Sequence, residues 1–405
     1  MATFASPTGF SSPAGLPPAA RVLVALLRRV EQGRLVVETP RGERLAFGSG
    51  DHGPAAVLRV RDWRMAARTL RGGDVGFAES HLDGEWDSPD LVRLLTVIAA
   101  NQAALERAFY GRSWMRALLR VRHWMRRNTR RQARRNIVAH YDLGNAFYSA
   151  WLDRSMTYSS ALFGGDRAQP LEVAQHAKYR RMLDALALQP GSRILEVGCG
   201  WGGFAEAAAR AGHHVTGLSL SDAQTAYAQA RLVAAGLADR ADLRVQDYRD
   251  VRGSFDAVAS IEMVEAVGER WWPTYFRALH DALVPGGRAA IQAITIADDR
   301  FERYRTQSDF IQQHIFPGGM LASVTRLVAE AAAARLRLGD RHAFGRDYAE
   351  TLRRWLAAFD ARVGEIRHEF DDRFVRCWRF YLAYCAAGFE TGTTDVGQYV
   401  FVRDA

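Results

Sequence analysis

Cysteine is scarce in this chain of 405 residues, which contains Cys199, Cys377 and Cys385 and no others. The three share no zinc-type spacing, and so small and odd a number argues against a fold held together by disulfides. No stretch of about 18 uninterrupted apolar residues occurs, so the sequence predicts no transmembrane helix. Residues 1–20 have no charged segment ahead of an apolar core, which predicts a flexible leader and not a signal peptide. Together these absences predict a protein of the reducing cytoplasm.

Lysine is rarer still, because Lys178 is the single lysine among 54 basic residues. The basic charge is also concentrated: residues 101–140 contain eleven arginines and one acid, Glu106, a local balance of +10. Since the net charge of the whole chain is +9, the remaining residues are close to neutral. Apolar residues make up 48% and charged residues 24%, which is typical of a folded globular protein and excludes disorder as an overall description.

Three explanations fit the basic segment 101–140. The first is a solvated helix face. The second, nucleic-acid binding, would also require aromatic stacking or a readable motif, and neither is clear, so no nucleic-acid partner is expected. We favour an anionic membrane surface, because arginines alternate with apolar residues such as Leu118, Val121 and Trp124 in a basic amphipathic stretch. Each arginine near an anionic leaflet contributes about 1 kcal/mol to binding.

From about residue 170 onward, apolar runs alternate with helical stretches. Such alternation is typical of βαβ units and predicts an α/β fold with a doubly wound parallel sheet. The predicted strands are residues 192–198, 213–221, 241–247, 255–262, 287–296, 335–340 and 398–403. Residues 297–321 interrupt this rhythm and are predicted to form an insertion over the site, and residues 347–389 are predicted to be helical. We expect residues 21–135 to form a small accessory domain that ends in a basic linker helix, with strands at 34–38 and 56–60 and a helix that starts at Ser88 and Pro89.

A glycine-rich loop follows the first strand of this pattern, with the sequence LEVGCGWGGF at residues 195–204. Glycines let the backbone approach a ligand closely, and the helix start offers free N–H groups. Such loops serve NAD enzymes, methyltransferases and purely structural turns alike. The next strand lacks the terminal acid of a dinucleotide site. After the third strand, Asp247 and Tyr248 suit an adenine amino group and ring, although Asp247 is equally a solvated loop acid.

Several motifs together resemble the cyclopropane-fatty-acid synthases and mycolic acid cyclopropane synthases, a family of class I methyltransferases that use S-adenosylmethionine. The resemblance extends from about Asn136 to Arg403, and residues 21–135 resemble the N-terminal domain of the phospholipid-acting bacterial branch. It implies a Rossmann-like methyltransferase domain over residues 136–405, with an inserted lid. The motifs are HYDLGNAFYSAWLDRSMTYSSALF (140–163), LEVGCGWGG (195–203), GLSLSDAQ (217–224), MVEAVG (263–268), IQAITI (291–296), FIQQHIFPGG (310–319), FGRDYAETLRRW (344–355) and YLAYCAAGF (381–389).

The resemblance also assigns residues to the cofactor S-adenosylmethionine and to a bicarbonate ion, and it implies no metal. Tyr158 and Ser159 are assigned to the amino-acid moiety of the cofactor, and Gly198, Gly200 and Gly202 are assigned to the loop beneath it. Ser219, Leu220 and Gln224 are assigned to the ribose and the methionine portion. Asp247 and Tyr248 are assigned to the adenine. The predicted bicarbonate site consists of Ser160, Glu265, Gln292, Ile294 and Tyr348.

Three positions depart from the commonest family pattern. Ser160 stands where the family often has cysteine, but its backbone N–H is still able to bind an anion. Gln292 and Ala266 stand where histidines are common. Because glutamine donates a hydrogen bond but carries no proton at neutral pH, a proton relay does not transfer to position 292.

The implied reaction is transfer of a methylene group to the cis double bond of unsaturated phospholipid acyl chains, through a carbocation that bicarbonate deprotonates to give a cyclopropane. Phe147, Tyr148, Trp151 and Phe316 are candidates for the acyl channel, with core packing as the alternative for each. The expected partners are the unsaturated acyl chains and an anionic membrane, and the protein is expected to associate peripherally with the inner face of that membrane. A homodimer with a second copy of the chain is an open alternative. The alternatives in function are methyl branching without ring closure, small-molecule methylation, and non-catalytic lipid binding.

Overall fold

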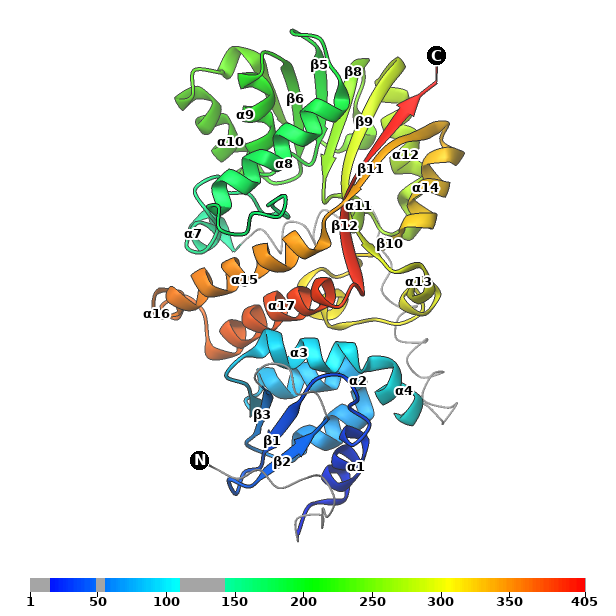
Figure 1. Ribbon diagram of the computed structural model, residues 1–405. Helices are drawn as coiled ribbons and strands as arrows, with labels where there is room; N and C mark the ends of the chain where they lie inside the picture. Colours follow the sequence, from blue (N-terminus) through cyan, green and yellow to red (C-terminus); the bar gives the residue numbers. More distant parts are fainter. Residues whose placement is uncertain (1–14, 49–54, 110–142, 405) are drawn as a thin grey trace. The chain divides into compact units, whose positions relative to one another are not determined.

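The computed structural model describes residues 15–48, 55–109 and 143–404 (Figure 1). They belong to two compact units: the accessory unit, within residues 1–115, and the main unit, within residues 116–405. The predicted domain boundary after residue 135 and most of the basic segment lie outside the described residues. No helix of the described residues is long and apolar enough to cross a membrane.

The accessory unit begins with helix α1 (Pro18–Leu27), so the predicted leader of residues 1–20 extends too far. Proline is favourable in a first helical turn, where its missing N–H is not needed. Ala20, Leu23 and Leu27 on this helix are buried, so residues 18–20 belong to the fold of the accessory unit.

A four-stranded sheet with the strand order β2-β1-β3-β4 forms the centre of the accessory unit. Strands β1 and β3 confirm the predictions at residues 34–38 and 56–60, and they pair in parallel, whereas β2 and β4 pair antiparallel at the two edges. The bounds are β1 (Leu35–Glu38), β2 (Arg44–Phe47), β3 (Ala56–Val60) and β4 (Trp86–Asp87).

The helix predicted to start at Ser88 and Pro89 begins later and is interrupted. Asp90 is its N-cap, since the Asp90 side chain accepts a hydrogen bond from the Arg93 N–H (2.9 Å), and the helix is α3 (Leu91–Ala100). A break at Asn101 separates α3 from α4 (Gln102–Phe109). The Asn101 side chain accepts hydrogen bonds from two backbone N–H groups about 70 positions earlier, which explains the break at this residue.

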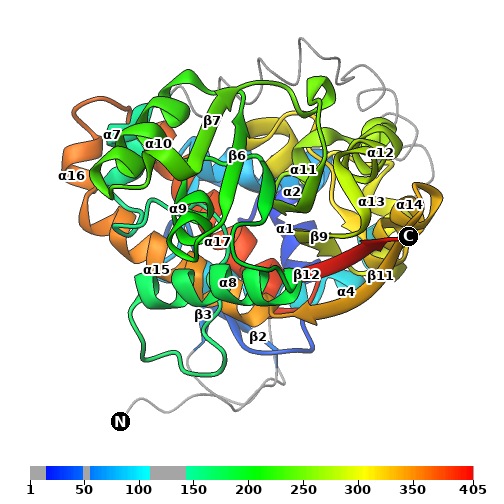
Figure 2. The same ribbon diagram turned by 90° about the horizontal axis from the view of Figure 1, so that it is seen from above.

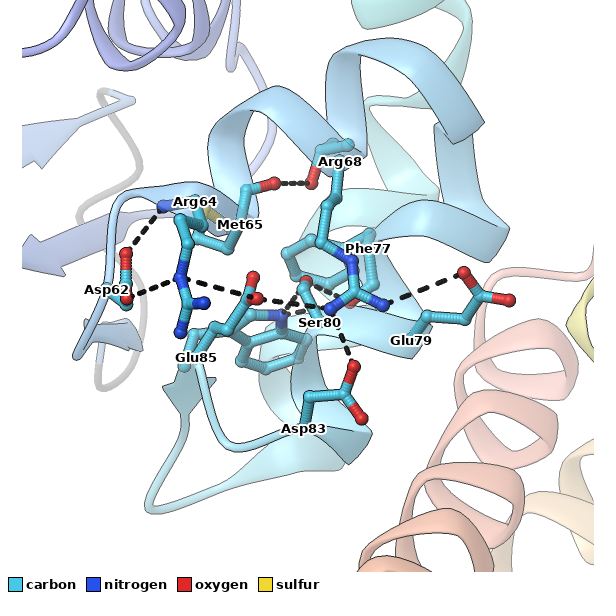
Figure 3. A network of polar contacts seen from close by, with 11 residues as sticks. Asp62, Arg64, Met65, Arg68, Phe77, Glu79, Ser80, Asp83 and Glu85 are labelled. Atoms are coloured by element: carbon cyan, nitrogen blue, oxygen red, sulfur yellow. Dashed lines mark hydrogen bonds and ion pairs between the residues drawn. The ribbon is translucent and has the colours of Figure 1, made fainter.

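Arg68 joins the long helix α2 (Arg64–Leu82) to the turn that leads into β4 (Figure 3). Its guanidinium lies 2.6 Å from Asp83, 3.1 Å from Glu85 and 3.8 Å from Glu79. These acids hold one arginine in place while α2 bends at Gly73, where φ is +60° and ψ is −135°. The bend brings the later half of α2 back against its first half.

The main unit contains an eight-stranded sheet with the path β11-β12-β9-β8-β5-β6-β7, and β10 pairs with the end of β9. Strands β5 to β9 are parallel, while β12 runs antiparallel between β9 and β11. This confirms the predicted doubly wound α/β sheet. The bounds are β5 (Arg193–Val197), β6 (His214–Ser219), β7 (Ala241–Val245), β8 (Phe255–Ile261), β9 (Leu283–Ile296), β10 (Ala322–Ser323), β11 (Leu336–Ala343) and β12 (Thr394–Arg403).

Helices cover both faces of this sheet (Figure 2). The buried side chains of α8 (Leu171–Leu186), α9 (Gly203–Arg210) and α10 (Asp222–Ala234) form one core with alternate strand residues such as Ile194. The side chains of α12 (Trp272–Ala282) and α14 (Val324–Ala333) form the other core with the intervening residues, such as Leu195. This alternation is what a strand buried on both faces requires.

The carboxyl ends of the parallel strands point toward the C-terminal helices (Figure 1). The helical stretch predicted at residues 347–389 is divided into α15 (Gly345–Ala361), α16 (Val363–Ile366) and α17 (Asp372–Glu390). The predicted insertion forms α13 (Asp298–Tyr304) and a π-helical turn (Ile311–Ile315), and its Phe310 ring packs on Phe380 of α17 (4.8 Å between centroids).

Two glycines of α2 test the packing of the bend. A Cβ at Gly76 would lie 2.2 Å from the carbonyl oxygen of Arg68, whereas a Cβ at Gly72 would meet nothing within 4 Å. We expect Gly76→Ala to destabilise the unit by about 1–3 kcal/mol through overpacking. In calorimetry of the full chain this should lower the melting temperature by at least about 4 °C.

Gly72→Ala is the matched control on the same helix, and it should be neutral or stabilise by up to about 1 kcal/mol. Equal melting temperatures for the two variants would show that the bend does not require the close approach at Gly76.

Candidate functional site

The strand order reverses direction between β5 and β8, because β6 follows on one side of β5 and β8 lies on the other. Ligands of open α/β sheets bind outside the carboxyl ends of the strands at such a switch point. The glycine loop follows β5 there, and Glu262 follows β8 directly. The site is therefore expected between these two strand ends.

The three predicted cofactor glycines of the loop all adopt positive φ angles: +87° at Gly198, +49° at Gly200 and +81° at Gly202. Packing explains two of them, since a Cβ at Gly198 would lie 3.0 Å from Met263 and one at Gly202 would lie 2.8 Å from Ala228. A Cβ at Gly200 would meet nothing within 4 Å. The loop is thus packed against the protein on both sides and open at Gly200, which is where a cofactor can approach the backbone.

Two of the residues predicted near the ribose form a small polar group at the end of β6. The Ser219 hydroxyl donates to the Gln224 side chain (3.2 Å) and accepts from the Ser221 N–H (3.1 Å). Ser221 caps α10 by accepting from the Gln224 N–H (3.3 Å). Ser219 and Gln224 are thus brought together, with Leu220 half-buried beside them.

The predicted adenine pair lies after β7. The Asp247 carboxylate accepts from the backbone N–H (3.0 Å) and from the guanidinium of Arg249 (2.8 and 2.5 Å), and this pairing raises the pKa of Arg249. Tyr248 packs its ring edge-on against Tyr275 (5.7 Å between centroids). Asp247 is therefore not simply a solvated loop acid, and an adenine amino group would share it with Arg249.

The segment Tyr158–Ser160 reaches the end of β8 through Ser160. The hydroxyl groups of Tyr158 and Tyr381 lie 2.7 Å apart, and the Ser159 hydroxyl accepts from the Lys178 ammonium (2.6 Å). The backbone N–H of Ser160 donates to Glu262 Oε1 (2.8 Å). Three consecutive residues predicted for the site are thus held by three different side chains.

Glu262 is the central residue of the site, and the sequence reasoning missed it. Its Oε1 accepts from Ser160 N and from Gln292 Nε2 (2.8 Å each), and its Oε2 accepts from the Tyr348 hydroxyl (2.6 Å). In the sequence, Glu262 is an acid at the end of the predicted strand 255–262, three residues before Glu265. An acid in that place looks like an ordinary helix cap.

Glu265, on the short helix α11 (Val264–Val267), interacts with the backbone of β9. Its Oε1 accepts from the Ile294 N–H (2.5 Å), as the predicted proximity of these two residues requires. Its Oε2 is buried without a hydrogen-bond partner. Burial, together with the nearby charge of Glu262, raises the pKa of the Glu265 carboxyl to about 8, so that this carboxyl is mostly protonated at neutral pH.

A chain of amides fixes the orientation of Gln292. The side-chain oxygen of Gln292 accepts from Gln398 Nε2 (3.1 Å), and the oxygen of Gln398 accepts from Arg181 (2.9 Å). The Nε2 group of Gln292 must therefore face Glu262. Lys178 lies next to this chain, fully buried, and burial lowers its pKa to about 7 while the charge of Glu262 opposes that shift.

Aromatic rings surround Tyr158, with centroid distances of 5.4 Å to Tyr148, 5.6 Å to Trp151 and 5.4 Å to Trp355. Of the predicted channel residues, Phe147, Tyr148 and Trp151 are exposed by 4% or less, as core packing predicts. Phe316, which follows the π-helical turn, is half-buried and lies 6.1 Å from the Tyr381 ring. The thiol of Cys199 is buried, which raises its pKa and makes it an inert filler of the loop.

The residues present do not fit a bicarbonate ion. The N–H of Ser160, the amide of Gln292 and the hydroxyl of Tyr348 all bind Glu262, and the N–H of Ile294 binds Glu265. A further anion would find these donors occupied and two carboxyl groups beside it. The predicted site residues are brought together as expected, but around a glutamate of the chain.

Comparisons with known proteins identify the family. A profile described as mycolic acid cyclopropane synthetase matches residues 128–399. The chain is 40% identical to tuberculostearic acid methyltransferase UfaA1 of Mycobacterium tuberculosis, over 89% of this chain and 86% of that protein. It is 34% identical to cyclopropane-fatty-acyl-phospholipid synthase of Escherichia coli, over 86% and 88%.

Solved structures show the same relationship. The cyclopropane synthase MmaA2 from Mycobacterium tuberculosis has a TM-score of 0.63 and 28% identity, covering 66% of this chain and 98% of that chain. The mycolic acid cyclopropane synthase CmaA1, complexed with SAH and CTAB, has a TM-score of 0.62 and 29% identity, covering the same shares.

Sheet order, glycine loop and these structures define the main unit as a class I S-adenosylmethionine-dependent methyltransferase, as the resemblance implied. Within that class, the chain belongs to the mycolic acid cyclopropane synthetase family.

The open face of the loop at Gly200 makes a direct test of cofactor binding. Gly200→Val should weaken S-adenosylmethionine binding by more than about tenfold, equivalent to about 1.4 kcal/mol, because the side chain would occupy the cofactor's space. Titration calorimetry on the folded variant measures this.

Gly236→Val is the matched control. Gly236 also has a positive φ angle (+69°) and open space around its Cβ, but it lies at the start of the loop that enters β7. It introduces similar backbone strain away from the strand ends and should leave affinity unchanged. Wild-type affinity in both variants would remove the glycine loop from the cofactor site.

Proposed function

We propose that this enzyme transfers a one-carbon group from S-adenosylmethionine to the cis double bond of an unsaturated acyl chain in a phospholipid, and that the added carbon closes a cyclopropane ring. The observation that carries the proposal is the pair of carboxyl groups of Glu262 and Glu265 beside the strand switch point, together with the aromatic rings that surround Tyr158. The named functions of the relatives support the same chemistry.

The cofactor is proposed to lie over Gly198, Gly200 and Gly202, with Ser219 and Gln224 toward its ribose and Asp247 and Tyr248 toward its adenine. When bound there, it supplies an electrophilic methyl group on a positively charged sulfur. An unactivated alkene is a weak nucleophile, so the chain's own task is to hold the double bond in line and to exclude water.

The aromatic and acidic residues suit a positive charge that moves from the cofactor onto the lipid. Rings such as Tyr158 and Trp355 exclude water and attract a cation by about 0.5–2 kcal/mol. Burial and the nearby charge of Glu262 raise the pKa of Glu265 to about 8, whereas Glu262 accepts hydrogen bonds from three donors, which favours its ionised form. An ionised Glu262 attracts the positive charge of the reacting groups.

A second outcome of the same first step is a branch without ring closure, in which loss of a proton after a hydride shift leaves an exocyclic methylene group. It is favoured by one observation, the 40% identity to a protein named as a tuberculostearic acid methyltransferase. Both outcomes begin with attack of the alkene on the methyl group and end with loss of a proton, so the same residues serve either.

Lipid analysis tests the proposed function. Bacterial cells that express the chain should convert unsaturated acyl chains of their phospholipids into species heavier by 14 mass units, and NMR of the extract should show cyclopropane protons. Exocyclic methylene protons in their place would establish the branching outcome. No change in mass, with purified protein still binding S-adenosylmethionine, would refute lipid methylation and leave a small-molecule methyltransferase.

The phospholipid substrate implies contact with a bilayer. We propose that the arginines of residues 101–140, with a local balance of +10, bind the anionic inner face of the cell membrane from the cytoplasm. The protein is then a peripheral membrane enzyme, and a homodimer is the alternative partner for this segment.

Charge reduction tests the membrane role. Replacing Arg126, Arg127, Arg130 and Arg131 with glutamine should weaken binding to anionic vesicles, and binding of the wild type should fall as salt shortens the Debye length from about 10 Å at 0.1 M to about 3 Å at 1 M. Sedimentation with anionic and zwitterionic vesicles measures both effects. Equal binding of wild type and variant would assign these arginines to another role, and S-adenosylmethionine affinity should not change in either case.

A further inference from the structure

The chain supplies its own carboxylate at the place where the family resemblance implies a bicarbonate ion. Three donors from separate segments, Ser160 N–H, Gln292 Nε2 and the Tyr348 hydroxyl, converge on Glu262 at 2.6–2.8 Å. The same number and kind of donors would otherwise bind an exogenous anion. A second anion here would lose its water and face the charge of Glu262, which disfavours it on both counts.

The backbone at Glu262 is held in a conformation that glutamate rarely adopts. Its φ angle is +51°, in the left-handed region that favours glycine. Its N–H donates to the Gln292 carbonyl oxygen (2.8 Å), so the residue is fixed by the sheet while its side chain turns toward the three donors. Non-glycine residues in this region persist only where the surroundings impose them, and they cluster at functional sites.

The carboxylate of Glu262 keeps one free lone-pair position. Ser160 and Gln292 have no exposed surface, whereas residue Glu262 as a whole is half-buried. A carboxylate offers about four lone-pair positions, and three are used here. One position on Oε2 is left for a proton.

We propose that Glu262 is the base that removes the proton in the last step of the reaction, and that the enzyme therefore needs no bicarbonate. This inference rests on the proposed function. The proton leaves the methyl carbon that the lipid has gained. The electron pair of that C–H bond then forms the last bond of the cyclopropane ring or, if a hydride has shifted first, the exocyclic double bond. Glu262 becomes a neutral carboxylic acid and returns the proton to water after product release.

The surroundings of Glu262 suit a base of moderate strength. Burial raises the pKa of the Glu262 carboxyl, which favours proton uptake, while Lys178 and the three donors favour the ionised form that must be present first. Gln292, whose orientation the amide chain through Gln398 fixes, donates a hydrogen bond without competing for the proton. The glutamine that departs from the family pattern thus fits a glutamate base.

Bicarbonate depletion is the first part of the test. Wild-type enzyme is assayed with S-adenosylmethionine on vesicles of dioleoylphosphatidylglycerol, first in buffer freed of carbon dioxide. The assay is then repeated with about 20 mM bicarbonate at the same pH and at the same ionic strength of about 0.1 M. Product and S-adenosylhomocysteine are both measured. We expect equal rates in the two buffers.

Chemical rescue is the second part. Glu262→Gln should lower turnover by about 10²–10⁴-fold, the usual contribution of a general base, with S-adenosylmethionine affinity retained. Glu262→Gly should be equally inactive without bicarbonate, because it removes the base while a glycine accepts the left-handed backbone. It leaves Ser160, Gln292 and Tyr348 free to bind an added anion, so bicarbonate should restore turnover at least about tenfold in this variant, whereas chloride should not.

Arg335→Gly is the matched control, since Arg335 is an exposed residue with a φ angle of +60° away from the strand ends. Its turnover should equal that of the wild type and should not respond to bicarbonate. A wild-type rate that falls when bicarbonate is removed would overturn the inference while leaving the proposed function intact. So would wild-type turnover in a Glu262→Gln variant that is folded and binds the cofactor. A wild type without any lipid product refutes the proposed function itself.

Discussion

The convergence of hydrogen-bond donors on one carboxylate is the interaction on which the arrangement of the site depends. Ser160, Gln292 and Tyr348 lie 102, 30 and 86 positions from Glu262 in the chain, yet all three donate to it. The sheet fixes the backbone of Glu262, and the donors bring the segment before β5, the strand β9 and the helix α15 to the same point. Each donor left without an acceptor would be destabilising in a buried site.

Long-range charge interactions then set the chemistry of the neighbouring groups. Burial, reinforced by the charge of Glu262, raises the pKa of Glu265 to about 8, so this carboxyl keeps its proton at neutral pH. Lys178 feels the same charge, which opposes the effect of its burial. The acidic and basic groups of the site are therefore coupled through Glu262, and a change at that position would alter the protonation of both.

The sheet was predictable because its signals are local: apolar runs alternate with helical stretches, and the glycine loop marks the first turn. The starts of α3 and α17 each depend on one capping aspartate, Asp90 and Asp371, and the sequence pattern missed both boundaries. Most of the predicted site residues came from the family resemblance. Glu262 was missed because an acid after a strand is common, and its importance comes from donors about 30 to 100 positions away.

The distribution of basic residues has a practical consequence. The chain has a single lysine, and Lys178 is fully buried beside Ser159, whereas every other basic side chain apart from histidine is a guanidinium. Amine-reactive reagents do not modify guanidinium groups, so in the folded protein they have only the α-amino group to attack. Labelling of the Lys178 side chain would accordingly report each opening of the contact between α8 and the site.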